Sequence, residues 1–129
     1  MTDVLPAGKV ALPAEAAALG EFWSQRVVGE ANGSLFKVAK GIGSTNWHAH
    51  DDQDEVFLVL RGKLVVELRD GDVELGEGEL LVVPRGVEHR PRADREVHLL
   101  LVGTAVTSTA AGGKPEWSAG GGTPGPEPG

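Results

Sequence analysis

Short apolar stretches separated by turn signals fill the middle of this chain and constrain its fold more than any other feature. Asn32-Gly33 and Asp70-Gly71 are typical of two-residue hairpin turns, because both residues of each pair tolerate positive φ. Arg61-Gly62 and residues 76–78 indicate further turns. Strands that are punctuated by turns every eight to twelve residues or so predict an all-β sandwich or a closed barrel.

Three apolar runs give more detail about these strands. In residues 55–60, alternation places Glu55, Phe57 and Val59 on one face of the predicted strand and Val56, Leu58 and Leu60 on the other, so both faces must be covered. We expect the outer face to pack against the N-terminal segment or a second subunit, which motivates the prediction of a homodimer. Residues 80–83 are predicted as a buried run, and residues 97–102 as a closing apolar strand.

The N-terminal part of the chain differs from the rest in being rich in alanine. Residues 1–13 show no periodicity and predict a loose arm. Residues 14–25 favour a short helix packed on the barrel, with Leu19, Phe22 and Trp23 on one helical face.

The chain has the length of a single domain, 129 residues. We divide it into an N-terminal arm and helix (1–25), a β-barrel (26–107) and a C-terminal tail (108–129). The tail is mostly Gly, Pro, Ala and Ser. It cannot bury enough surface to offset its ordering entropy, so we expect it to be flexible.

Charge and composition exclude several classes of function. Nineteen acidic against twelve basic residues give a net charge of -7, which argues against a general affinity for nucleic acid or for an anionic membrane. The chain has no cysteine, so disulfides and thiolate metal sites are excluded. No apolar run has the length of a membrane span and the N-terminus does not resemble a secretory signal, so we expect a cytoplasmic protein.

Three of the four histidines and one glutamate are spaced like the ligands of a metal ion. His48 and His50 are two residues apart, so on a strand both imidazoles would project from the same face. Glu55 follows a short polar reversal that aims its carboxylate back at the pair, and His89 supplies a fourth donor. Three imidazoles and one carboxylate suit iron, manganese, nickel, zinc or copper, and leave one or two octahedral positions for water or substrate. A His-x-His pair on its own has a plainer interpretation, two polar residues on a strand.

The spacing of these residues resembles the two sequence motifs of the cupin family. The first motif is matched by His48, His50, Glu55 and Gly62. The second motif is matched by Gly78, Pro84, Gly86 and His89. Two positions depart from the pattern: the leading glycine of the first motif is displaced by one residue, and Ala93 stands where the second motif has Asn.

The resemblance covers about residues 34–102. It implies the cupin double-stranded β-helix, a jelly-roll barrel, here with a short N-terminal helix. It also implies a metal held by His48, His50, Glu55 and His89. The implied chemistry is broad, because cupins include oxygenases, isomerases, epimerases, decarboxylases, sugar binders and storage proteins.

Five other side chains are candidates for a place in or near the site. Asn46 is either a contact to the metal ligands or substrate, or a polar residue at the barrel mouth. We interpret His98 as a structural residue rather than a ligand, and Trp23 as core rather than as a platform for a ligand. Lys37 and Lys40 alternate to opposite faces of their strand, so at most one of them points inward.

Three functional hypotheses remain open. The first is a metal-dependent enzyme, of oxygenase or isomerase type, that acts on a small molecule in the barrel with one divalent metal ion, iron or manganese being favoured over zinc, nickel or copper. The second is a non-catalytic module that binds a carboxylate or sugar through the metal. The third is a structural cupin in which the metal only stiffens the barrel. Ligand spacing identifies neither the substrate nor the general base.

Overall fold

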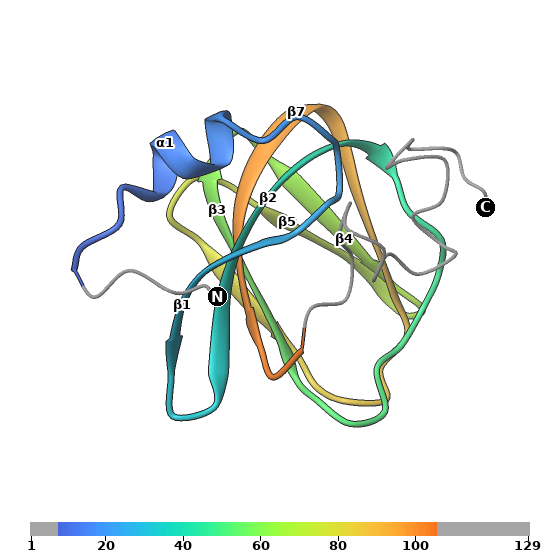
Figure 1. The fold of residues 1–129 in the computed structure, drawn as a ribbon. Coiled ribbons are helices and arrows are strands. Elements are labelled where there is room, and N and C mark those ends of the chain that lie inside the picture. The colour runs from blue at the N-terminus through green and yellow to red at the C-terminus, as the bar shows by residue number, and fades with distance from the viewer. Residues whose placement is uncertain (1–7, 106–129) are drawn as a thin grey trace.

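The computed structural model of the chain describes residues 8–105, and in this range it has one short helix and seven antiparallel strands (Figure 1). The elements are α1 (Leu12–Ala17), β1 (Arg26–Ala31), β2 (Ser34–Ser44), β3 (Glu55–Arg61), β4 (Leu64–Leu68), β5 (Gly71–Leu75), β6 (Leu80–Val83) and β7 (His89–Gly103). The predicted all-β fold with a short N-terminal helix is confirmed. All of these strands lie within residues 26–107, whereas the predicted tail at 108–129 lies outside the described residues.

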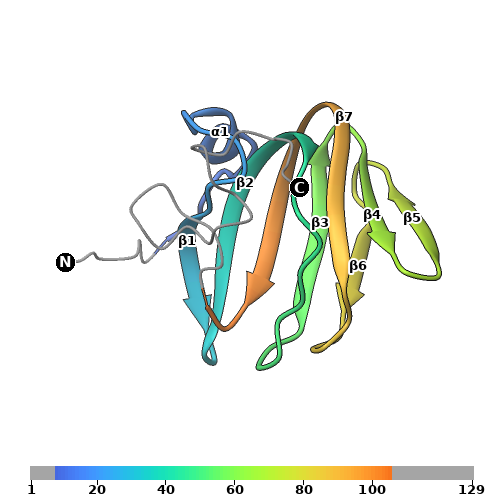
Figure 2. The same cartoon turned by 90° about the vertical axis from the view of Figure 1, so that its right-hand side faces the viewer.

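Strand β7 is the centre of the sheet, because it pairs with β2, β3 and β4. The strand order is β1-β2-β7-β3-β6, and the β4–β5 hairpin joins it through β7. The first residues of β7 pair with β4, and its later residues pair with β2 and β3. Figure 2 shows the resulting curved sheet, with β1 at one side and the β4–β5 hairpin at the other.

The inner face of the curved sheet carries one of two hydrophobic cores. In β3 the inner residues Glu55, Phe57 and Val59 are buried, as alternation predicted. The whole inner core consists of Trp23, Ala39, Phe57, Val59, Leu64, Val66, Leu75, Val83, Ala93, Val97, Leu99 and Leu101. Since an inward-pointing polar residue must lie among these side chains, burial of any charge there has to be compensated.

The outer face of the sheet is covered on one side by the N-terminal segment. Leu58 and Leu60 of β3 pack there in a cluster that also contains Ala16 of α1 and Leu100 of β7. The prediction that the N-terminal segment covers the second apolar face of β3 is therefore confirmed for these two leucines. Among residues 8–105 the structure has no helix long and apolar enough to cross a membrane.

The helix is shorter than predicted and begins earlier. It runs over Leu12–Ala17 instead of 14–25. Pro13 is tolerated in the first turn, whereas Gly20 and the left-handed conformation of Trp23 (φ 66°) cannot belong to a helix that continues. The prediction that Leu19, Phe22 and Trp23 share one helical face is also wrong. Leu19 packs in the outer cluster, whereas Phe22 and Trp23 pack against the inner core.

The prediction that residues 80–83 form a buried run is wrong. Leu80 is 57% exposed and Val82 is 48% exposed. Strand β6 lies at the edge of the sheet and pairs only with β3, so its outward side chains have no covering layer among the described residues. The Asn32-Gly33 turn, by contrast, is confirmed, since both residues have positive φ (53° and 82°).

Gly41→Ala is expected to destabilise the protein, because a Cβ at this position would overlap the indole ring of Trp23. We expect a loss of about 1–3 kcal/mol in the free energy of unfolding, the usual cost of overpacking. Urea denaturation measures it. Gly29→Ala is the matched control in a neighbouring strand, since its Cβ would meet only Phe36 Cβ at 3.9 Å. Equal losses in the two variants would contradict the packing argument.

Candidate metal centre

The four predicted ligands come from three separate segments that meet inside the sheet. His48 and His50 lie between β2 and β3, Glu55 is the first residue of β3, and His89 is the first residue of β7. The expected strand around His48 and His50 is absent: His48 forms a single bridge with His89, and the described residues around it have no regular strand. One pair of backbone hydrogen bonds, His48 N–H to His89 O and His89 N–H to His48 O, is enough to align the two histidines.

The side chains of the four residues converge on one point. One ligand atom from each lies within 4.8 Å of those from the other three. The Glu55 carboxylate oxygen Oε1 is 3.2 Å from His50 Nε2 and 3.5 Å from His89 Nε2. Sequence spacing therefore predicted correctly which residues the fold brings together.

Backbone carbonyls orient two of the three imidazoles. His48 Nδ1 donates to Asn46 O at 2.8 Å, and His89 Nδ1 donates to Val87 O at 2.9 Å. In both cases the acceptor is two residues earlier in the chain. A proton held on Nδ1 leaves Nε2 as the coordinating nitrogen, which is the arrangement that orients histidine ligands in metal sites.

The surroundings of the cluster favour an ionised Glu55 and a neutral His48. Burial lowers the pKa of His48 from 6.5 to about 4, with a further contribution from the neighbouring His89. Burial alone would raise the pKa of Glu55, but His50, His89 and Lys37 together bring it well below its usual range. At neutral pH Glu55 is therefore ionised and His48 is neutral, the protonation states that metal ligands require.

The donor set fits a divalent cation. The Nε2 atoms of His50 and His89 are buried and have no hydrogen-bond partner among residues 8–105. Buried polar atoms without a partner are costly, so an arrangement that aims two of them at a common point calls for a cation there. With nitrogen and oxygen donors only, the set suits a transition-metal ion of borderline softness.

Lys37 is an inward-facing residue that the sequence left undecided. It lies on the inner face of β2, is fully buried (0% exposed), and donates from Nζ to Ala105 O at 2.6 Å. Burial lowers its pKa, and the nearby Glu55 partly offsets that effect. Lys40 faces outward, with Nζ 4.0 Å from Glu96 Oε2. Strand alternation required that Lys37 and Lys40 point to opposite faces of the sheet, but it did not indicate which of them points inward.

Asn46 lies next to the cluster, whereas His98 lies outside it. Asn46 holds the His48 ring through its backbone carbonyl, and its side-chain Oδ1 is buried without a hydrogen-bond partner among the described residues. His98 lies on the outer face of β7, where its Nε2 donates to Glu96 Oε2 at 2.8 Å. The prediction that His98 is a structural residue is confirmed, since its ring is paired outside the cluster.

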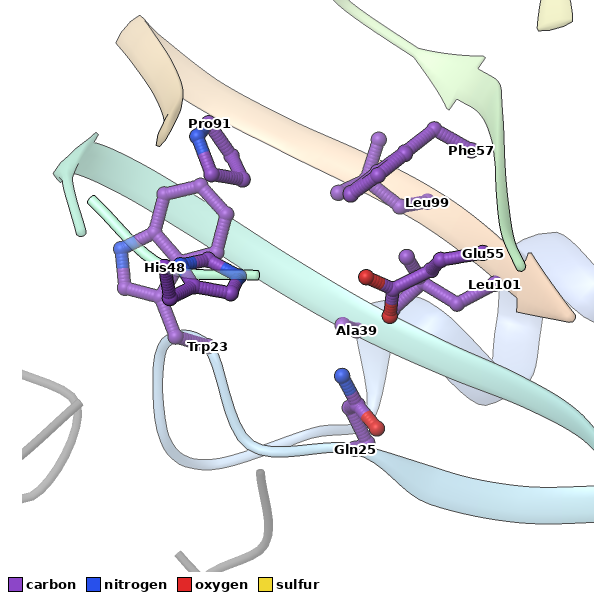
Figure 3. Close-up of a pocket in the computed structure, with 9 residues that line it drawn as sticks. All are labelled: Trp23, Gln25, Ala39, His48, Glu55, Phe57, Pro91, Leu99 and Leu101. Carbon is purple, nitrogen blue, oxygen red and sulfur yellow. The ribbon is translucent and has the colours of Figure 1, made fainter. Parts of the chain in front are cut away.

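A small cavity adjoins the cluster, and two residues of the N-terminal segment help to enclose it. It has a volume of about 20 Å³ and is lined by Trp23, Gln25, Ala39, His48, Glu55, Phe57, Pro91, Leu99 and Leu101 (Figure 3). Trp23 is in the core, as predicted, and it also forms a wall of this cavity. No sequence pattern pointed to Gln25, which is 8% exposed and whose side chain extends toward Glu55 in Figure 3.

The antiparallel barrel and the cluster of three histidines and one glutamate are the features that the sequence resemblance to cupins implied. Comparison with known proteins gives the same family. The model of the cupin domain (Cupin_2) matches residues 34–103, more than half of the chain. The chain belongs to the cupin family.

Individual relatives support the same assignment. A cupin-2 domain protein from Shewanella frigidimarina is 38% identical, with a TM-score of 0.70 over 72% of this chain and 91% of that one. NMB1881 from Neisseria meningitidis is 31% identical, with a TM-score of 0.69 over 76% of this chain and 100% of that one. YdbB from Bacillus subtilis (strain 168) is 34% identical over 67 residues, which span 51% of this chain and 59% of YdbB.

The metal-free protein is expected to lose stability as the pH falls from about 6.5 toward about 4. Between these values the unfolded chain binds a proton at His48 that the folded chain does not, because burial depresses the folded-state pKa to about 4. The loss from this residue is at most on the order of 3 kcal/mol. Urea denaturation in the presence of a chelator, at several pH values, measures the slope. His48→Gln should flatten it, and an unchanged slope would show that His48 is not the group responsible.

Proposed function

We propose that this protein is a mononuclear metal-binding cupin in which His48, His50, Glu55 and His89 hold one divalent ion. We further propose that it is a metal-dependent enzyme of oxygenase or isomerase type acting on a small molecule in the barrel. Iron and manganese suit the three-nitrogen, one-oxygen donor set best, and zinc, nickel and copper are compatible with it.

The observation that carries this proposal is the pair of buried Nε2 atoms on His50 and His89. Both are inside the protein without a hydrogen-bond partner among the described residues, and both lie close to the Glu55 carboxylate. A purely structural cluster would be expected to satisfy these atoms with hydrogen-bond donors.

Different residues would have different roles around the bound ion. Glu55 supplies the negative charge that balances the ion, and backbone carbonyls keep the rings of His48 and His89 turned with Nε2 inward. The apolar side chains of the cavity limit access of bulk water, which strengthens electrostatic interactions at the site. The bound ion would supply Lewis acidity, or electron transfer if it is iron or manganese.

A second candidate function is a structural or ligand-binding cupin without turnover. The small volume of the cavity, about 20 Å³, favours the structural alternative, because it leaves little room for a bulky substrate beside the candidate ligands. A ligand that raises the melting temperature without being consumed would support the binding role.

Metal content is expected to depend on the cluster. Untagged wild-type protein should contain about one equivalent of a divalent transition metal by elemental analysis, and His50→Ala should lose it, since the ligand atoms act together. His98→Ala is the matched control, because this histidine is bonded to Glu96 on the outer face. The proposal would be contradicted if the wild-type protein neither carries metal nor takes it up on titration.

Turnover is expected to require the same residues. Metal-loaded wild-type protein should consume dioxygen or convert a member of a metabolite panel of small acids and sugars, and His50→Ala should show at least about a hundredfold lower rate because the site would lack a ligand. Oxygen uptake and NMR of the substrate mixture measure this. Equal rates in the wild type and His50→Ala would assign any turnover to a contaminant.

The predicted homodimer and cytoplasmic location stay predictions. The exposed Leu80 and Val82 of β6 supply a candidate dimer surface. The mass of the protein in solution, measured by light scattering, tests the dimer.

A further inference from the structure

The cavity beside the four candidate ligands is small enough to be selective by size. Its volume is about 20 Å³. A volume of this order leaves little room for a bulky ligand. Two of the candidate ligands, His48 and Glu55, form part of its wall. A molecule held in the cavity would therefore lie directly beside the proposed metal.

The lining of the cavity is mostly apolar. Apart from His48, Glu55 and Gln25, its lining consists of apolar side chains, namely Trp23, Ala39, Phe57, Pro91, Leu99 and Leu101. Cavities with apolar walls bind apolar guests such as xenon. In Figure 3 the two candidate ligands lie on different sides of the cavity, with His48 beside Trp23 and Glu55 beside Leu101.

Trp23 is held in place as one wall of this cavity. Its backbone N–H donates to Lys40 O at 2.6 Å, and its indole Nε1–H donates to Ile42 O at 3.0 Å. The two acceptors flank Gly41, and a side chain at Gly41 would overlap the ring. Trp23 also has a left-handed backbone conformation, φ 66°, which is unfavourable for a large side chain and must be held by its surroundings.

We propose that Trp23 is the specificity-determining residue of the site, limiting the size of the ligand that can lie beside the metal. This deepens the proposed function and rests on it, since the ligand is selected for its position beside the metal. Gly41 is part of the same device, because only a residue without a side chain leaves room for the indole ring.

The first test needs no metal. Xenon under pressure is expected to shift the methyl NMR signals of Leu99 and Leu101 in the metal-free wild-type protein, since both side chains line the cavity. Indole should not bind the wild type, but it should bind Trp23→Ala and raise its melting temperature, because the vacated space matches the lost side chain. Absence of xenon shifts at these leucines, or indole binding to the wild type, would overturn the proposal.

The second test uses protein loaded with Co²⁺, whose visible spectrum reports a ligand that reaches the metal. Azide and benzoate carry the same charge and differ in size. Azide is expected to change the spectrum of both the wild type and Trp23→Ala. Benzoate is expected to bind Trp23→Ala at least about tenfold more tightly than the wild type, the range that shape discrimination by a pocket provides. Equal benzoate affinity in the two proteins would overturn the proposal.

Two further variants serve as controls for Trp23→Ala. Phe36→Ala removes an aromatic side chain on the outer face of β2, so it controls for general loosening and should bind benzoate as the wild type does. Trp23→Phe keeps an aromatic ring over Gly41 and should lie between the wild type and Trp23→Ala, which provides a reading if Trp23→Ala does not fold. If the protein binds no Co²⁺, the proposed function fails, while xenon and indole still decide whether Trp23 closes the cavity.

Discussion

Two backbone hydrogen bonds between His48 and His89 join the parts of the candidate site, and its geometry depends on them. At 3.0 Å and 2.9 Å they connect the segment after β2 to the first residue of β7. Strand β7 is in turn paired with β2, β3 and β4. The sheet therefore sets the position of both histidines, although His48 and His50 themselves lie outside the strands. Sites carried by paired strands are held more precisely than sites on free loops.

Burying ionisable side chains in the cluster is energetically costly, and two features of the fold reduce this cost. Lys37 lies inside the same sheet as Glu55 and lowers the pKa of that carboxyl, so the interior holds one cationic and one anionic side chain. Burial also lowers the pKa of His48 to about 4, so this imidazole is neutral at neutral pH. Two buried Nε2 atoms still have no hydrogen-bond partner among residues 8–105. These donors are arranged so that they could hold a cation.

Sequence patterns predicted the structure wherever the relevant neighbours are close along the chain or repeat regularly. Alternation placed Glu55, Phe57 and Val59 on the inner face, because a strand turns every second side chain to the same side. Periodicity failed at Leu19 and Trp23, which have helical spacing but pack in two different cores. It also failed at 80–83, since an apolar run does not reveal whether a strand lies at the edge or in the middle of a sheet.

By itself the sequence determined the strands, the turns and the four residues that meet in the candidate site, because these depend on residue types at short, regular spacings. It also placed the chain in its family. Only the tertiary structure decided that Lys37 and not Lys40 faces inward, and that Trp23 and Gln25 enclose a cavity beside His48 and Glu55. These features depend on contacts such as Trp23 against Gly41 and Lys37 with Ala105. The residues of each pair are distant in sequence, so no local pattern encodes their meeting.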